Sequence, residues 1–407
     1  MKTRIALLFV STMTLAACGG SPSPSNPTPA DPAASPSTPS SPSGGGSTQN
    51  PGGGTQGNPG TNQPGPQPDP QPQPGQQPAQ PAPQPQPQQG NAAPASLSHH
   101  RCGWIFTIDS AAAQTFIQNA AYYDAIHPDW FALQSDSVGI RNLKDVDNAA
   151  VLAAAKANHV AVIPLVTSVE SVDWTRAMIS DPGKRAAHVA ELVKLAQSHN
   201  YDGLDLDYEH LWNPSDKAPL LAFIQQFAAA MHAVNKSASM AVPALDGPSS
   251  VWDYAATSAA LDDVHMMGYD FHTIGTHAGP TAPLGWIEQV NANVQAQGGH
   301  PEKFILGLPN YGVTTTSACT LSTCAATCTG PVSTTTTEMD GCASNTNHYR
   351  AGRILNCNTA AGMLFFDDTQ SLEEKVSSAK GHGIGGIGYW NVGGEPTGYF
   401  AMVKKYF

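Results

Sequence analysis

The sequence predicts an α/β fold, a parallel (β/α)8 barrel, placed after a long segment that cannot form a core. Eight apolar runs of strand length recur between residues 97 and 407, and helix-like patterns lie between them. That span has a normal length for one such barrel. An open doubly wound sheet usually has fewer strands, and no Gly-x-Gly-x-x-Gly turn follows the first run.

The apolar runs give the expected strands in order. Each is short and bounded by turn residues, as the buried strands of a parallel sheet are. The expected strands are residues 102–108, 130–134, 160–166, 203–209, 240–244, 264–269, 304–309 and 386–391. The helix-like stretches are residues 149–158, 184–199, 219–234 and 372–382. In a barrel of this kind, chemistry is expected at the C-terminal ends of the strands.

The first residues have the pattern of an export signal. Met1–Arg4 is a short basic head, and Ile5–Ala17 is a mostly apolar run that is too short to span a bilayer. Leu15–Cys18 resembles the lipobox of bacterial lipoproteins, which implies removal of residues 1–17 and diacylation of Cys18. An ordinary signal peptide cut at nearly the same place is the alternative. We expect an exported bacterial lipoprotein, anchored at the periplasmic or outer cell surface, whose only contact with the membrane is its N-terminal lipid.

Residues 18–96 predict a disordered tether. Of the chain's 35 prolines, 22 lie between residues 21 and 96, and the charged residues there are Asp31 and Asp69 alone. A segment rich in Pro, Gln, Gly and Ser cannot bury enough apolar surface to offset its chain entropy. Pro-rich stretches favour extended polyproline II, so we interpret the segment as a spacer. A specific peptide ligand for another domain is the alternative.

The charge of the chain narrows the possible partners. The net charge is −12, almost all of it on residues 97–407. Nucleic-acid binding requires a basic face, so an acidic domain argues against a nucleic-acid partner. Neutral substrates such as glycans are compatible with this charge. We expect the folded part to be a monomer.

The fourth expected strand carries three acids in an alternating pattern. Asp205, Asp207 and Glu209 are separated by apolar residues, so the acids share one face of the strand. In a barrel they would point inward, stacked about 7 Å apart. Such carboxylates cannot all ionise cheaply, so at least one proton should be retained and the pKa values pushed apart. A Mg²⁺ or Ca²⁺ site is one alternative, and a solvated acidic strand, disfavoured by the apolar opposite face, is another.

This strand also resembles a family signature. Asp-Gly-x-Asp-x-Asp-x-Glu is the signature of glycoside hydrolase family 18, which holds chitinases and endo-N-acetylglucosaminidases, and it matches at Asp202, Gly203, Asp205, Asp207 and Glu209. Three further segments resemble the family in the same order, at residues 267–270, 307–312 and 386–390. The resemblance covers roughly residues 101–407 and implies the same barrel fold. Asp202 and Gly203 are expected to be structural, with Asp202 bracing the turn.

The resemblance implies a role for each of the three acids. Most retaining glycosidases use two carboxylates, but in family 18 the substrate's own 2-acetamido oxygen is the nucleophile. Glu209 is expected to protonate the leaving oxygen. Asp207 is expected to bind the acetamido N–H, and Asp205 to share a proton with Asp207. No cofactor and no metal are implied, because the nucleophile belongs to the substrate.

The other matching residues are expected to surround these acids. Tyr269 is expected to hold the acetamido carbonyl, and Asp270 to contact the sugar or hold Tyr269 in place. Trp390 is expected to form an apolar floor under the sugar ring. Met267 is expected to pack at the same substrate-binding site.

Two features differ from the larger chitinases. The third expected strand lacks the Ser-x-Gly-Gly of many members, and residues 313–362 form a Thr- and Cys-rich insertion with no obvious α+β pattern. Residues 366–386 are more similar to the branch that contains spore-cortex and related peptidoglycan glucosaminidases. A deep, processive chitinase cleft is therefore not expected.

Cysteine usage is consistent with export. Besides Cys18 the chain has six cysteines, an even number that suggests up to three disulfides in an exported protein. The disulfide candidates are Cys102, Cys319, Cys324, Cys328, Cys342 and Cys357. Five of these lie in the insertion, Cys102 is a candidate to pair with one of them, and the pairing stays open. The lack of a Cys-x-x-Cys spacing disfavours zinc.

These observations predict a retaining glycoside hydrolase that cleaves β-linked N-acetylglucosamine polymers by substrate-assisted catalysis. Chitin, peptidoglycan and N-glycan cores all offer the required sugar. The alternative is a non-catalytic chitinase-like carbohydrate-binding protein, although such members usually lack the terminal acid that Glu209 supplies here. A third interpretation, an inert structural barrel, leaves the three acids unexplained.

Overall fold

The computed structural model describes residues 100–106, 110–273, 279–315, 331–333, 349–351, 354–359 and 362–407. The predicted signal segment, the tether and Cys18 lie outside these residues. Within the described ranges, no helix is both long enough and apolar enough to cross a membrane.

Eight parallel strand positions close into a barrel, which confirms the predicted fold. In chain order the barrel strands are β1 (Arg101–Ile105), β2 (Ala125–Leu133), β4 with β5 (Ala161–Val162 and Leu165–Thr167), β6 (Gly203–Asp207), β7 (Ser237–Pro243), β8 (Asp263–Met267), β9 (Phe304–Pro309) and β15 (Gly386–Trp390). Each position pairs with the next, and β15 pairs with β1 to close the ring. A short strand, β3 (Ile140–Asn142), extends the sheet antiparallel to β2.

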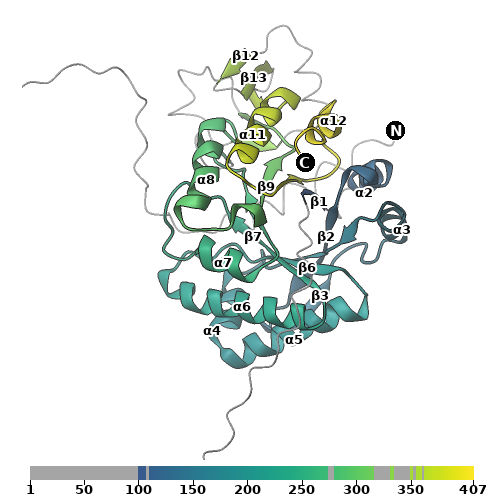
Figure 1. The fold of residues 1–407 in the computed structure, drawn as a ribbon, viewed down its shortest axis with the longest axis vertical. Coiled ribbons are helices and arrows are strands. Elements are labelled where there is room, and N and C mark those ends of the chain that lie inside the picture. The colour runs from purple at the N-terminus through teal and green to yellow at the C-terminus, as the bar shows by residue number, and fades with distance from the viewer. Residues whose placement is uncertain are drawn as a thin grey trace, which may run out of the picture. The chain divides into compact units, whose positions relative to one another are not determined.

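Helices follow the strands along the chain and lie around the barrel (Figure 1). They are α2 (Ser110–Asn119), α3 (Ala149–Asn158), α4 (Val172–Ser180), α5 (Pro182–Ser198), α6 (Lys217–Ala233), α7 (Tyr254–Ala260), α8 (Leu284–Ala296), α11 (Thr369–Gly381) and α12 (Tyr399–Val403). Asn148 and Asp181 begin α3 and α5, because their side chains accept hydrogen bonds from first-turn N–H groups. The four predicted helices are confirmed, with ends that differ by at most three residues.

The outward face of β6 joins the barrel to its helices. Leu204, Leu206 and Tyr208 are all fully buried, as the alternating pattern predicts. The Tyr208 ring stacks on Phe223 of α6 at 5.8 Å, and its hydroxyl lies 2.7 Å from Nε2 of His188 on α5. This packing fixes the strand's rotation, so that the alternate residues Asp205 and Asp207 must face the barrel interior.

Seven of the eight strand positions differ from their predicted limits, and three of these differences bear on the site. The third position is split into β4 and β5 around Pro164, because proline has no N–H for the strand ladder. Strand β2 begins at Ala125 rather than Trp130, so it includes His127 and Asp129. Strand β6 ends at Asp207, and Glu209 lies in the loop that follows. His127 and Asp129 interrupt the apolar run in the first half of β2, so the sequence pattern indicated only its second half.

The insertion contains regular structure that the sequence did not predict. A five-stranded antiparallel sheet has the order β11 (Pro331–Ser333), β10 (Val313–Thr315), β14 (Gly362–Phe366), β13 (Ile354–Thr359) and β12 (Tyr349–Ala351). Strands β10, β11 and β12 have three residues each, and β13 contains Asn and Thr, so these four give no strong apolar pattern. Cys319, Cys324, Cys328 and Cys342 lie outside the described residues, as does the side chain of Cys357.

Candidate active site

Six of the predicted site residues line one cavity of about 280 Å³ beyond the C-terminal ends of the barrel strands. They are Asp207, Glu209, Met267, Tyr269, Asp270 and Trp390. The wall also includes residues that sequence reasoning did not single out, among them Trp104, Phe106, Asp129, Thr167 and His265. The strand ends therefore bring together acids from β2, β6 and the loop after β8, as expected for a barrel enzyme.

Glu209 lies two residues past the end of β6, at the wall of the cavity. Its side chain keeps 27% of its surface exposed. Burial, and after it the charge of Asp270, raises the pKa of Glu209 to about 7. The carboxyl can therefore hold a proton near neutral pH and still release it, which is what a general acid requires.

Asp207 is the middle acid of the three. Its Oδ2 accepts a hydrogen bond from the Thr167 hydroxyl at 3.3 Å. Its buried Oδ1 makes no hydrogen bond with the residues that the structure describes. Burial, then the charges of Glu209 and Asp205, raises the pKa of Asp207 well above its ordinary value. This shift favours the protonated form of the carboxyl, and Oδ1 remains available for a ligand.

Asp205 is fully buried beneath Asp207, and its pKa shifts in the opposite direction. Trp104 Nε1 and Ser239 Oγ each donate to its carboxylate at 3.0 Å, and His265 Nδ1 lies 3.0 Å from both of its oxygens. Burial works to raise the pKa of Asp205, but His265 and the other donors outweigh it and hold the pKa below its usual range. The predicted separation of pKa values is thus present in the structure.

The predicted sharing of a proton between Asp205 and Asp207 would need a direct bond between them. No hydrogen bond joins the two carboxyls among the described residues. Asp205 instead raises the pKa of Asp207 through its charge. In this arrangement Asp205 acts on its neighbour electrostatically, and its own oxygens are occupied by donors from three other strands.

Tyr269 and Asp270 follow the end of β8. Burial, then the charges of Glu209 and Asp207, raises the pKa of Tyr269 well above its ordinary value, so its hydroxyl remains a hydrogen-bond donor. Asp270 has φ 61°, a left-handed conformation that is uncommon for a residue with a side chain. Tyr311 donates to Asp270 Oδ1 at 2.5 Å, and the Asp270 N–H donates to Thr281 Oγ1 at 2.9 Å. These bonds hold the Asp270 carboxylate toward the cavity.

The aromatic side of the cavity is built around Trp390 at the end of β15. Its ring lies 6.0 Å from Phe106 and 6.5 Å from Trp104, so the three rings form one apolar surface. The peptide bond from Trp390 to Asn391 is cis. Apolar aromatic surfaces of this kind match the C–H face of a sugar ring. Trp390, the predicted floor residue, therefore presents an apolar surface to the cavity.

Asp202 and Gly203 lie at the other end of β6, away from the cavity. The Asp202 carboxylate accepts a hydrogen bond from the Val162 N–H at 2.8 Å, which ties β6 to the third strand position. A Cβ at Gly203 would lie 2.1 Å from Ser237 Oγ and 2.5 Å from the Ser237 carbonyl oxygen. Only glycine fits at this point.

Sequence reasoning missed a further acid, Asp129, because the second strand was expected to begin after it. Asp129 is buried on β2 and lines the cavity. Burial, then the charge of Asp207, raises its pKa to about 7, although Arg141 acts in the other direction. The signal was the spacing of His127 and Asp129, which are two residues apart on one strand face.

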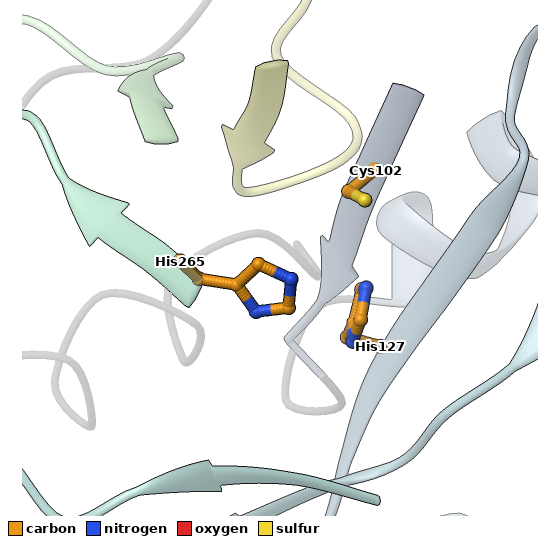
Figure 2. A group of neighbouring side chains, drawn as sticks. All are labelled: Cys102, His127 and His265. Carbon is orange, nitrogen blue, oxygen red and sulfur yellow. The ribbon is translucent and has the colours of Figure 1, made fainter. Parts of the chain in front are cut away.

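The candidate disulfide of Cys102 stays a prediction, because the side chains of its candidate partners lie outside the described residues. Cys102 itself is buried on β1. It lies near His127 and His265, with the possible ligand atoms of the three residues within 4.8 Å of one another (Figure 2). In a tetrahedral zinc site the ligand atoms lie roughly 3.5 Å apart, so a separation of up to 4.8 Å is not by itself evidence of a zinc site. Burial, then the charge of Asp263, raises the pKa of the Cys102 thiol well above its usual value. The thiolate that would bind a metal is therefore disfavoured. We assign no metal to these three residues.

Comparison with known proteins agrees with this geometry. A family model described as glycosyl hydrolases family 18 matches residues 105–395. The chain belongs to glycoside hydrolase family 18. The predicted resemblance is thereby confirmed, and the match covers all four of the predicted segments.

Individual family members differ considerably from the chain. The glycosylase YvbX of Bacillus subtilis is 26% identical over 218 residues, which are 51% of this chain and 62% of that protein. A chitinase structure from Chromobacterium violaceum has a TM-score of 0.66 at 20% identity, covering 75% of this chain and 98% of the other. The spore cortex-lytic enzyme SleL of Bacillus cereus has a TM-score of 0.66 at 17% identity, covering 76% and 74%. At these identities the two structures establish the barrel fold alone.

Proposed function

We propose that this family 18 protein is a retaining glycoside hydrolase that cleaves β-linked N-acetylglucosamine polymers with the help of the substrate's own acetamido group. One observation carries the proposal. The cavity contains Glu209, whose pKa is raised to about 7 by burial and by Asp270, next to Asp207 with an oxygen free of hydrogen bonds to the described residues. A proton donor and an N–H acceptor therefore lie together in one cavity, as this chemistry requires.

In the first step, Glu209 gives its proton to the glycosidic oxygen as the bond from that oxygen to the anomeric carbon breaks. The acetamido oxygen forms a new bond to the same carbon, while Asp207 accepts a hydrogen bond from the acetamido N–H. The Tyr269 hydroxyl, which stays protonated, donates to the acetamido oxygen and orients it. Trp390 supports the apolar face of the ring.

In the second step, Glu209 acts as a base. It takes a proton from a water molecule, whose oxygen bonds to the anomeric carbon as the bond to the acetamido oxygen breaks. Two displacements at one carbon give net retention. Glu209 is protonated again at the end, so the cycle balances without a cofactor.

The substrate class is proposed as chitin, peptidoglycan or an N-glycan core. The family's chitinases and spore cortex-lytic enzymes support the first two. The direct test is product analysis on chitin oligomers, purified peptidoglycan and a high-mannose glycoprotein in parallel. Glu209→Gln should abolish hydrolysis, and Glu288→Gln, an acid outside the cavity, should not. Hydrolysis that survives Glu209→Gln unchanged would exclude Glu209 as the acid, and binding without hydrolysis by the wild type would favour a carbohydrate-binding protein.

The substrate-assisted step has its own test. A substrate with hydroxyl in place of the 2-acetamido group lacks the nucleophile, so its turnover should fall by orders of magnitude. Equal turnover of the two substrates would contradict the mechanism while leaving Glu209 as the acid. Retention at the anomeric carbon, read by NMR of early products, completes the assignment.

Export and lipid anchoring at Cys18 are part of the proposal. The lipobox-like segment supports them, because a thiol at that position is the acceptor for the diacyl group. Cys18→Ala in the full chain should move the protein from the membrane fraction to the soluble fraction of an exported preparation. Equal membrane association of the variant and the wild type would contradict anchoring through this residue.

A further inference from the structure

The charge of Asp205 has to be compensated inside the protein. Its side chain is fully buried, and an ionised carboxylate without a partner is very costly in such a place. Trp104 and Ser239 supply neutral donors at 3.0 Å. Neutral donors satisfy the oxygen lone pairs, but they do not balance a full charge. A cationic partner is therefore needed if Asp205 is to remain a carboxylate.

His265 is positioned to be that partner. Its Nδ1 lies 3.0 Å from both oxygens of Asp205, and its side chain is 1% exposed. Burial works to lower the pKa of His265, but the charges of Asp205 and Asp263 outweigh it and raise the pKa above the ordinary value. The pKa of Asp205 moves down for the same reason. The two partners shift in opposite directions, as the members of an ion pair do.

Among the groups around Asp205, His265 is the main source of positive charge. Figure 2 shows His127 and Cys102 reaching from β2 and β1 toward His265 on β8. His127 Nδ1 lies 3.3 Å from Asp205 Oδ2, and the two imidazole rings meet edge to face at 4.7 Å. Cys102 is held as a neutral thiol. The other charged groups that act on the pair are Asp207, which shares its strand with Asp205, and Asp263, which lies on β8 with His265.

We propose that His265 is a positioning residue that holds Asp205 as a carboxylate and so leaves the transferable protons of the acid series on Asp207 and Glu209. His127 lies beside His265, with its Nδ1 3.3 Å from Asp205 Oδ2. This inference rests on the proposed hydrolase function only for its effect on catalysis. The Asp205–His265 ion pair itself is a property of the folded chain and can be measured without substrate.

The kinetic test uses His265→Asn. An asparagine side chain can place an N–H near the position of Nδ1, so it keeps a donor to Asp205 and removes the positive charge. Loss of a nearby cation disfavours the ionised forms of Asp205, Asp207 and Glu209, so their pKa values should rise. Both limbs of the kcat/KM pH profile should therefore move to higher pH by about one unit. The maximal kcat should fall by about tenfold with little change in KM, because the variant acts through Asp205, which is buried and absent from the cavity wall.

The control is His232→Asn, which removes a histidine that is also paired with an aspartate, Asp262, at 2.8 Å. His232 is absent from the cavity wall, so the pH profile of this variant should match that of the wild type. A merely structural role for His265 would lower activity without moving the pH limbs. A His265→Asn profile with unmoved limbs would overturn the proposal.

The second test is ¹⁵N NMR of the full chain labelled at histidine, and it does not depend on activity. His265 should show two protonated ring nitrogens at pH 7.5 in both the wild type and the Glu209→Gln variant. A neutral imidazole signature at that pH would overturn the ion pair, whether or not the chain hydrolyses glycans. Absence of hydrolysis together with a protonated His265 would refute the proposed function and leave the ion pair standing.

Discussion

Asp270→Asn should lower the pKa of Glu209 and shift the pH range of activity. Burial and Asp270 together raise that pKa from 4.5 to about 7, a difference in proton affinity of about 3 kcal/mol. Asparagine keeps the size of the side chain and an acceptor for the Tyr311 hydroxyl, which now bonds to Asp270 at 2.5 Å. Only the negative charge is lost. Because burial is the larger cause and remains, we expect a decrease of about one unit.

The assay is the pH dependence of kcat/KM on a soluble chitin oligomer. Catalysis requires protonated Glu209, so activity falls as the pH rises through its pKa, and the basic limb should move from about 7 to about 6. At pH 7.5 the protonated fraction falls about eightfold, whereas at pH 5 it barely changes. Asp173→Asn, which alters an exposed acid on α4, is the control and should leave the profile in place. A uniform loss of activity at every pH would refute the electrostatic reasoning and indicate a role in substrate contact.

Three further predictions concern other residues. Burial lowers the pKa of His188 to about 4. The neutral His188 therefore contributes about 3 kcal/mol to the free energy of unfolding above pH 6.5, and this contribution is lost as the pH falls toward 4. In urea unfolding, the His188→Gln variant should show a weaker dependence of stability on pH between 6.5 and 4. Tyr269→Phe removes a donor from the cavity, so kcat should fall about 100-fold in steady-state kinetics with an unchanged circular dichroism spectrum. Gly203→Ala forces a Cβ against Ser237, so chemical denaturation should show a loss of about 2 kcal/mol or more, whereas Gly285→Ala, with open space around it in α8, should not destabilise the fold.

The barrel and the acid-bearing strand were predictable because their signals are local. Strand β9 has the predicted limits, residues 304–309, since it is a continuous apolar run. The alternation in β6 places Leu204 and Leu206 outward and Asp205 inward, because the period of a strand is two residues. The family signature then supplied roles for the acids, and the cavity brings together most of the residues that it named.

What could not be predicted depends on contacts between strands that are distant in the sequence. The state of Asp205 is decided by Trp104, Ser239 and His265, which come from β1, β7 and β8. No spacing in the sequence indicates that these four residues meet. Asp129 was missed for a related reason, since a polar residue inside a barrel strand interrupts the apolar run by which strands are recognised.

The differences among the acids explain how one barrel interior can contain so many of them. If Asp205, Asp207 and Glu209 were all ionised, their repulsion and burial would oppose folding. In the structure, Asp205 is paired with His265, the surroundings of Asp207 raise its pKa and so favour its protonated form, and the pKa of Glu209 is raised to about 7. The interior therefore carries little net charge although it is rich in carboxyls. Because the same separation of pKa values leaves protons on the two acids nearest the cavity, a change that removes the positive charge beneath Asp205 should affect folding stability and the pH range of catalysis together.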